Sequence, residues 1–276
     1  LKCRSCTLSL PQGTGKETYI ARVNEKTYFI KLNIDLARYD AVASIDLTPQ
    51  VIKQGVLDDG TTLLVQPYIK GKNPSRKEYR LFLEIFASMI HRLHHDETVK
   101  RLLPPAKDES YRSAGLTALE KIIAKWVSLR DLVPNNIAFI EESVEFLRQE
   151  LSVFSGSGLV ASHNDICNAN WLLAEDGHLY LIDLDSMSQD DPALDIGATL
   201  WWYYPPELRP RFLEITGHLD DAEFSKRMKI RMAMHCLNIL LPRPNSYDQF
   251  DPVSFGENLV DFKAALAGEE NPQGYE

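Results

Sequence analysis

Residues 162–185 of this 276-residue chain carry an unusual number of acids and amides between short apolar runs. The stretch HNDICNAN, residues 163–170, fits the pattern H-x-D-x-x-x-x-N, and the apolar run HLYLID then ends on Asp183. An unpaired carboxylate in a protein interior costs several kcal/mol, so acids held at strand ends usually have a cation as partner. The arrangement therefore points to a bound cation, for which a metal ion is one candidate.

Phosphoryl transfer is a chemistry that needs these residue types. One aspartate accepts the proton of the attacking hydroxyl and must stay free of the metal, while an asparagine and a second aspartate hold Mg²⁺. Mg²⁺ takes oxygen ligands and bridges the nucleotide phosphates. Asp165 suits the first role, and Asn170 and Asp183 suit the second. A hairpin turn at Asp176-Gly177 would return Asp183 to the edge on which the loop lies.

Two features near the N-terminus could hold the phosphates. The turn PQGTGK contains Gly13 and Gly15, whose missing side chains let backbone N–H groups approach an anion. Lys31 lies in the apolar run TYFIKLN, from which it could point inward to the α- and β-phosphates. Each feature also has an ordinary explanation, because a glycine turn between strands is commonly a plain hairpin and a strand lysine is commonly solvated.

Together these motifs resemble the catalytic core of the aminoglycoside phosphotransferase and choline kinase family, protein-kinase-like enzymes that phosphorylate small molecules. SHNDICNANWLL resembles the family's H-G/N-D-x-x-x-x-N-I/V/L-L segment. LIDLDSMSQDDPALDIG resembles its second segment, which has an apolar-Asp-apolar-acid start and a later D-I/L-A/G end. The H-N-D form, and IDLD in place of Asp-Phe-Gly, separate the chain from protein kinases. The resemblance is sharp over 162–197, fair over 11–31 and indistinct after 205.

The resemblance implies Asp165 as the catalytic base, and Asn170 and Asp183 as Mg²⁺ ligands. It implies ATP as the phosphate donor, with nucleotide contacts from the N-terminal region at Gly13, Gly15, Lys31, Gln66, Tyr68 and Ile69. It also makes Asp195 a structural aspartate, which would support the catalytic loop through backbone hydrogen bonds. His163 would likewise support that loop without doing chemistry.

The sequence departs from the family's pattern at two places. The helix after Lys31 has no glutamate to pair with it, so Asp40 is the best acidic candidate, with Asp35 and Asp46 as competitors. Trp171 stands where the family usually has Ile or Val. A separate question is Asp185, which could contact a second metal ion or simply form a hydrogen bond.

The elements that must position these residues change character along the chain. Residues 1–68 alternate like short strands, with helical spacing over 35–45. Later helices are expected over 76–95, 111–130, 137–154, 193–203, 221–241 and 253–267. We therefore predict an α+β protein with the protein-kinase-like bilobal fold that the resemblance implies. A small N-terminal antiparallel sheet lobe with one helix, 1–68, would meet a larger, mostly helical lobe, 69–276, at a hinge near 66–72.

Composition narrows the classes of function. The net charge of −9 argues against a nucleic-acid partner and favours a neutral or cationic small substrate. No apolar run reaches the roughly 18 residues of a membrane helix, and the N-terminus lacks a signal-peptide core, so no membrane partner is predicted. The four cysteines show no disulfide framework, which favours a reducing, cytoplasmic compartment. The oligomeric state is left open.

These observations favour an ATP- and Mg²⁺-dependent kinase of a small-molecule hydroxyl, preferably on an amino alcohol, amino sugar or aminoglycoside. The aromatic run Trp201–Tyr204 could face a quaternary amine, or it could be core. Acids that could meet a cationic substrate, or could simply start helices, are Asp220, Asp221, Glu223, Asp248 and Asp251.

Three alternatives remain open from the sequence. The acceptor could be a neutral sugar or another metabolite on the same fold. The chain could be a catalytically idle kinase-like module that binds nucleotide. It could also be a metallohydrolase, for which His91, His94 and His95 would offer a metal-binding face. The simpler interpretation of these histidines is the end of an amphipathic helix.

Overall fold

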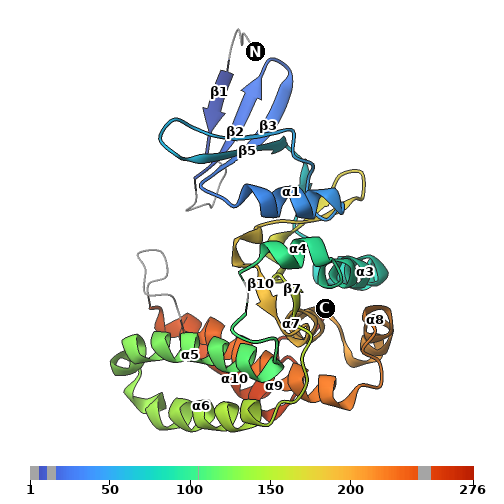
Figure 1. The fold of residues 1–276 in the computed structure, drawn as a ribbon. Helices are drawn as coiled ribbons and strands as arrows, with labels where there is room; N and C mark the ends of the chain where they lie inside the picture. The colour runs from blue at the N-terminus through green and yellow to red at the C-terminus, as the bar shows by residue number, and fades with distance from the viewer. Residues whose placement is uncertain (1–5, 11–16, 105, 242–249) are drawn as a thin grey trace.

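The computed structural model describes residues 6–10, 17–104, 106–241 and 250–276, which form two lobes stacked end to end (Figure 1). A five-stranded antiparallel sheet in the order β1-β2-β3-β5-β4 makes the smaller lobe. Its strands are β1 (Cys6–Ser9), β2 (Thr18–Val23), β3 (Lys26–Leu32), β4 (Lys53–Val56) and β5 (Thr62–Pro67). The pairing of β3 with both β2 and β5 places Lys31 in the interior of this sheet.

Helix α1 (Leu36–Ser44) lies at the end of the sheet that faces the larger lobe (Figure 1). Asp35 begins it as a side-chain cap, since its carboxylate accepts the N–H of Arg38 at 3.1 Å. The helix buries Tyr39 and Val42 and leaves Asp40 exposed. It therefore turns a tyrosine, and not an acid, toward the inside of the lobe.

The chain passes between the lobes through a short strand, β6 (Gly71–Lys72), which pairs with β8 (Trp171–Ala174). A side chain at Gly71 would place its Cβ 2.4 Å from the carbonyl oxygen of Leu173, so only glycine allows this approach. The strand β9 (Leu179–Leu181) completes the three-stranded sheet after the turn at Gly177. The hinge predicted near 66–72 spans the end of β5 and the strand β6. Its role as a hinge stays a prediction.

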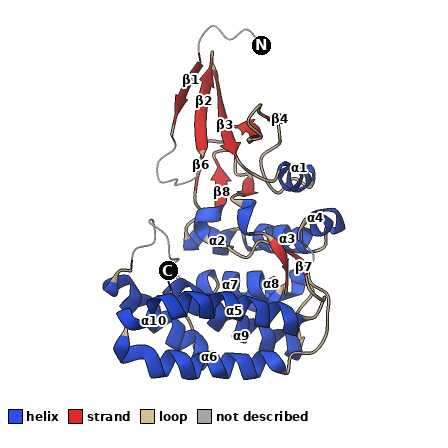
Figure 2. Cartoon of the chain, turned by 60° about the vertical axis from the view of Figure 1, so that its left-hand side comes forward, coloured by secondary structure: helices blue, strands red, loops and turns tan. Residues whose placement is uncertain are grey.

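The larger lobe is mostly helical (Figure 2). Its helices are α2 (Arg76–Leu81), α3 (Leu83–His94), α4 (Glu97–Leu102), α5 (Tyr111–Leu129), α6 (Ile137–Ser152), α7 (Ala193–Tyr203), α8 (Arg209–Thr216), α9 (Ala222–Leu240) and α10 (Pro252–Ala267). Nearly every residue of α7 is buried, because the helix lies between α2 and α3 on one side and the layer formed by α5, α6, α9 and α10 on the other (Figure 2). A second small sheet pairs β7 (Val160–Ser162) with β10 (Ser188–Asp190).

The single helix predicted over 76–95 is wrong in one respect, because the structure has two helices that meet at Phe82. The backbone of Phe82 leaves the helical region at φ −106° and ψ 24°. No glycine or proline marks this break, so the spacing of apolar residues ran through it unchanged. The short elements α4, α8, β7 and β10 were also not predicted, since few residues in each carry a periodic pattern.

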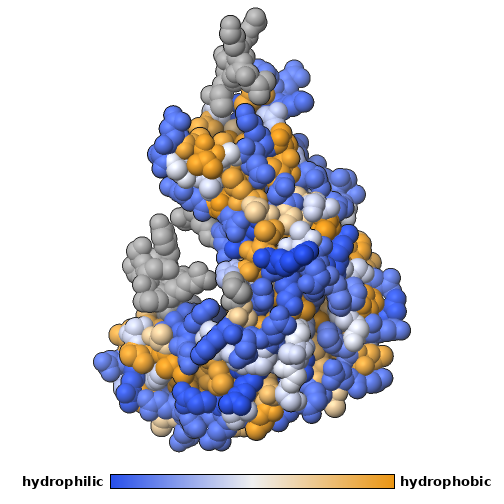
Figure 3. Space-filling model, viewed as in Figure 1, coloured by the Kyte–Doolittle hydropathy of each residue, from blue (hydrophilic) through white to orange (hydrophobic). Residues whose placement is uncertain are grey.

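On the face shown in Figure 3, hydrophilic side chains cover most of the larger lobe, with scattered apolar ones between them. Trp171 is one of the largest buried side chains, and its ring meets that of Phe86 edge-on at 4.9 Å between centroids. The departure from Ile or Val at this position therefore fills the core beneath the catalytic loop. Among the described helices, none combines the length and hydrophobicity that crossing a membrane requires.

Candidate functional site

Two cavities share the loop formed by residues 163–170, since residues 169 and 170 line one of them and residues 164–167 line the other. One, of about 500 Å³, lies between the lobes, and the other, of about 470 Å³, lies over the larger lobe. The predicted nucleotide and metal residues that the structure describes all line the first cavity: Lys31, Gln66, Tyr68, Ile69, Asn170 and Asp183. The predicted base, Asp165, lines the second. Gly13 and Gly15 lie outside the described residues.

The walls of the first cavity are largely apolar beside β5. Phe29, Ile69 and Leu172 line it together with Tyr68. The side-chain amide of Gln66 donates to the Pro49 carbonyl, which fixes this buried side chain in the wall. A largely apolar wall suits an aromatic ring.

Lys31 sits deeper in the same cavity and is 9% exposed. Its ammonium donates to the hydroxyl of Tyr39 at 2.5 Å and lies 3.9 Å from Oδ1 of Asp183. The sequence favoured Asp40 as its partner on the helix, but Asp40 is exposed one residue beyond Tyr39. The hydrogen bond that α1 offers to Lys31 therefore comes from a neutral phenol.

Asp195 supports the catalytic loop from behind, as the resemblance implied. Its fully buried carboxylate accepts the N–H groups of His163 at 2.8 Å and Asn164 at 3.0 Å. His94 of α3 adds a third contact, with Nε2 3.0 Å from Oδ2. Burial acts to raise the pKa of Asp195, but the contacts with His94 and the backbone of His163 outweigh it and keep that pKa below its usual value.

The histidines of α3 do not converge as a metal site would require. The side chain of His94 contacts the Asp195 carboxylate, whereas Nδ1 of His95 contacts the carbonyl oxygen of His91 at 2.8 Å. The simpler interpretation, an ordinary helix end, did not include the contact of His94 with Asp195. Nothing near His94 in the sequence marks that role, because Asp195 lies 101 residues away along the chain.

The two candidate metal ligands, Asn170 and Asp183, line the same cavity. The side-chain amide N–H of Asn170 donates to the carbonyl of Asp165 at 2.6 Å, which leaves Oδ1 of Asn170 as its outward oxygen. Asp183 adopts the left-handed conformation, with φ 59° and ψ 63°, at the end of β9. Such strain in a non-glycine residue is typical of functional sites. His163 steadies this strand end through a 3.1 Å contact of Nε2 with the Ile182 carbonyl.

These oxygens fit Mg²⁺, which usually takes one or two protein ligands and completes its shell with water and phosphate. One carboxylate and one amide oxygen, from Asp183 and Asn170, line the same cavity as Lys31. Asp185 is exposed and lines an adjoining cavity with Glu17 and Lys31, so its role stays open.

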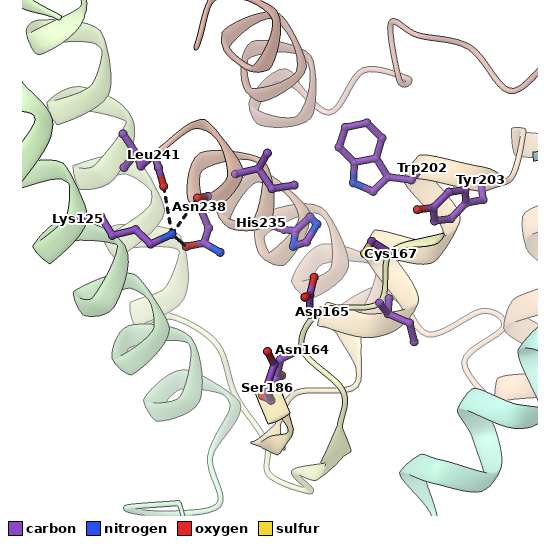
Figure 4. A pocket seen from close by; sticks show the side chains of 12 residues that line it. Lys125, Asn164, Asp165, Cys167, Ser186, Trp202, Tyr203, His235, Asn238 and Leu241 are labelled. Atoms are coloured by element: carbon purple, nitrogen blue, oxygen red, sulfur yellow. Dashed lines mark hydrogen bonds between the residues drawn. The ribbon is translucent and has the colours of Figure 1, made fainter. Parts of the chain in front are cut away.

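The second cavity is built from the catalytic loop and from the helices α5, α7 and α9 (Figure 4). Asp165 and His235 lie next to each other in it, with Trp202 and Tyr203 along one side (Figure 4). Burial lowers the pKa of His235, although the nearby carboxylate of Asp165 opposes this, so the imidazole is neutral at neutral pH. Lys125 donates to the Asn238 carbonyl and side-chain oxygen at 3.1 and 2.6 Å.

The aromatic run divides between core and cavity. Trp201, Tyr203 and Tyr204 are buried, and the Tyr203 hydroxyl accepts the N–H of Asn168 at 2.8 Å. Trp202 is half-buried and lines the second cavity. The core interpretation therefore applies to Trp201, Tyr203 and Tyr204, and a ligand contact of Trp202 stays a prediction.

Two of the late acids are helix caps. Asp221 and Asp251 accept N–H groups at the first turns of α9 and α10. Asp248, another of these acids, lies outside the described residues.

Comparison with known proteins identifies the family. A family model described as "Phosphotransferase enzyme family" matches residues 12–228. The chain belongs to this phosphotransferase family. The predicted family and the predicted class of enzyme, a small-molecule kinase, are thereby confirmed.

Solved structures share the fold at low sequence identity. Choline kinase LicA from Streptococcus pneumoniae is 17% identical, with a TM-score of 0.68 over 97% of this chain and 95% of its own. A Plasmodium vivax ethanolamine kinase is 12% identical, with a TM-score of 0.67 over 96% of this chain and 84% of its own. The spectinomycin phosphotransferase APH(9)-Ia is 15% identical, with a TM-score of 0.64 over 96% and 93%. The predicted α+β, protein-kinase-like fold class is confirmed.

Proposed function

We propose that the protein transfers the γ-phosphate of ATP to a hydroxyl group of a small amino alcohol. The observation that carries this proposal is the division of one loop between two cavities. Asp165 faces one cavity, while Asn170, five residues later, faces the other beside Asp183 and Lys31. A donor and an acceptor bound on the two sides would meet at the loop.

The nucleotide side supports ATP with Mg²⁺. The side chains of Phe29, Tyr68 and Ile69 would contact the adenine, and Lys31 would contact the phosphates. Asn170 and Asp183 would hold the metal ion, which neutralises charge on the phosphates when it is bound. Among the related structures, the spectinomycin phosphotransferase is a complex with ADP and LicA is a complex with AMP. An aminoglycoside phosphotransferase is a complex with GDP.

The acceptor side supports Asp165 as the base. Its carboxylate is half-buried and forms no hydrogen bond or ion pair with another described side chain, so it can receive a proton. The acceptor hydroxyl would give its proton to Asp165 as its oxygen forms the new bond to the γ-phosphorus. The bond between that phosphorus and the bridging oxygen breaks, and ADP leaves with the electron pair. The loop's backbone is already held by Asp195, so Asp165 needs little rearrangement.

The lining of the acceptor cavity favours a small acceptor with at most one positive charge. Asp165 is the one carboxylate among its described lining residues. The ammonium of Lys125 caps the end of α9 at Asn238 and Leu241, and His235 is neutral. The exposed part of Trp202 offers an aromatic face to an amine. An aminoglycoside with several ammonium groups would find fewer compensating carboxylates, so an amino alcohol is preferred.

A second candidate is a kinase of a neutral metabolite, which the presence of Lys125 at the cavity supports. An acceptor screen separates the possibilities. ADP formation from Mg·ATP would be measured with choline, ethanolamine, amino sugars, kanamycin and neutral sugars. We expect turnover that depends on an amino alcohol. Turnover with neutral sugars alone favours the second candidate, and nucleotide binding without any turnover favours an idle module.

A further inference from the structure

Helix α1 holds the backbone of the residue that follows Asp183. Nη1 of Arg38 donates to the Leu184 carbonyl at 3.0 Å, and the Tyr39 hydroxyl accepts the Leu184 N–H at 3.3 Å. Leu184 is fully buried, and adjacent residues of one helix thus satisfy both of its main-chain polar groups. The conformation of the chain immediately after Asp183 therefore depends on where α1 lies.

The same hydroxyl accepts a hydrogen bond from Lys31. An ammonium and an amide N–H can only donate, so both lone pairs of the Tyr39 oxygen act as acceptors. The Lys31 nitrogen is 2.5 Å from the hydroxyl oxygen and 4.9 Å from the ring centroid, so its shorter contact with Tyr39 is with the hydroxyl. Burial, followed by the nearby charge of Asp185, raises the pKa of Tyr39, so the phenol stays neutral.

In protein kinases the strand lysine pairs with a glutamate of the neighbouring helix. A carboxylate in that position compensates the charge of the lysine. A phenol orients the ammonium with a hydrogen bond and adds no negative charge to that of the Asp183 carboxylate 3.9 Å away. Tyr39 is 1% exposed and reaches both the lysine and the loop after Asp183 from a single oxygen atom.

We propose that Tyr39 is a positioning residue that joins the phosphate-binding lysine to the metal-ligand loop, in place of a helix glutamate. It acts through Lys31 and through the backbone of Leu184. This inference rests on the proposed use of a Mg·nucleotide at the first cavity.

The test measures binding of Mg·ATP by calorimetry in the absence of acceptor. Tyr39→Phe removes the hydroxyl and keeps the buried ring. We expect the Kd for Mg·ATP to rise about tenfold, because a hydrogen bond to a charged group is lost. Arg38→Gln removes the guanidinium that donates to the Leu184 carbonyl and does not line the cavity. This variant should raise the Kd by a smaller factor.

Tyr204→Phe is the matched control. Tyr204 is also fully buried, and its hydroxyl donates to the Tyr79 carbonyl at 2.9 Å, away from the first cavity. This variant should lose thermal stability by a similar amount and should bind Mg·ATP as the wild type does. A rise in Kd common to both variants would mean that Tyr39 has a general structural role, which would overturn the inference.

A double-mutant cycle with Lys31→Met tests the proposed route of action. If Tyr39 acts through Lys31, Tyr39→Phe should change the Kd much less in the Lys31→Met background than in the wild type. Equal factors in the two backgrounds would overturn the inference, and so would a Tyr39→Phe variant with unchanged Kd. Wild-type protein that fails to bind Mg·ATP would instead overturn the proposed function itself.

Discussion

The two cavities that meet at the catalytic loop are built in different ways. The first cavity, which we propose holds the nucleotide, is lined by Lys31 of strand β3, by Asn170 just before β8 and by Asp183 just after β9. The second cavity, which we propose holds the acceptor, joins the loop around Asp165 to side chains of helices far apart in the sequence, such as Lys125 and His235. The residues of the first cavity can therefore be recognised from short sequence motifs, whereas those of the second cavity are brought together by the packing of the helices.

The largest expected effect comes from Asp165→Asn, which should separate the two cavities functionally. The amide cannot accept the hydroxyl proton, so phosphate transfer should fall by about 10²–10⁴-fold. Binding of Mg·ATP should be unchanged, because Asp165 lies on the other side of the loop. Steady-state ADP formation and calorimetry would measure the two properties, and retained transfer would remove Asp165 as the base.

Asp183→Ala should have the opposite pattern, with loss of the donor side. Stabilisation by Mg·ATP follows RT ln(1 + [L]/Kd) and amounts to about 4 kcal/mol at a thousandfold excess over Kd. The variant should lose the Mg²⁺-dependent part of this thermal shift. Asp176→Ala, an exposed acid in the same hairpin, is the control and should keep it. An unchanged shift in Asp183→Ala would refute the metal assignment.

The stability of the larger lobe should respond to mild acid through its buried histidines. Burial lowers the pKa of His218 and of His235 to about 4, whereas an unfolded histidine titrates near 6.5. Between pH 6.5 and about 4 the unfolded chain binds more protons than the folded one, so stability falls as the pH falls.

The slope cannot exceed about 1.4 kcal/mol per pH unit for each histidine, because each side chain binds at most one proton. Urea unfolding at a series of pH values would measure it. His218→Gln should flatten the dependence without changing the KM of the acceptor. A dependence that both His218→Gln and His235→Gln leave unaltered would show that other groups control it.

The smallest effect is expected for His235→Leu, which sharpens the comparison on the acceptor side. The loss of a neutral hydrogen-bonding group next to Asp165 should raise the KM of the acceptor about fivefold. The KM of ATP should not change, because His235 does not line the nucleotide cavity. Equal changes in both KM values would argue against separate donor and acceptor sides.

The sequence by itself determined the order of the candidate site residues along the chain and the type of element in which each one lies. Residues 163–170 and Asp183 could be interpreted because a loop and a hairpin fix their spacing locally. Lys31 could be placed on a strand for the same reason. The family and fold class followed from these motifs.

The tertiary structure decided which groups meet across long separations. Tyr39 replaces the expected acid because the turn of α1 buries it and exposes Asp40. His94 reaches Asp195, and His235 reaches Asp165, only because α3 and α9 pack on either side of the catalytic loop. Such contacts arise from the burial of helix faces, and a helix's own spacing shows which face is apolar but not what it packs against.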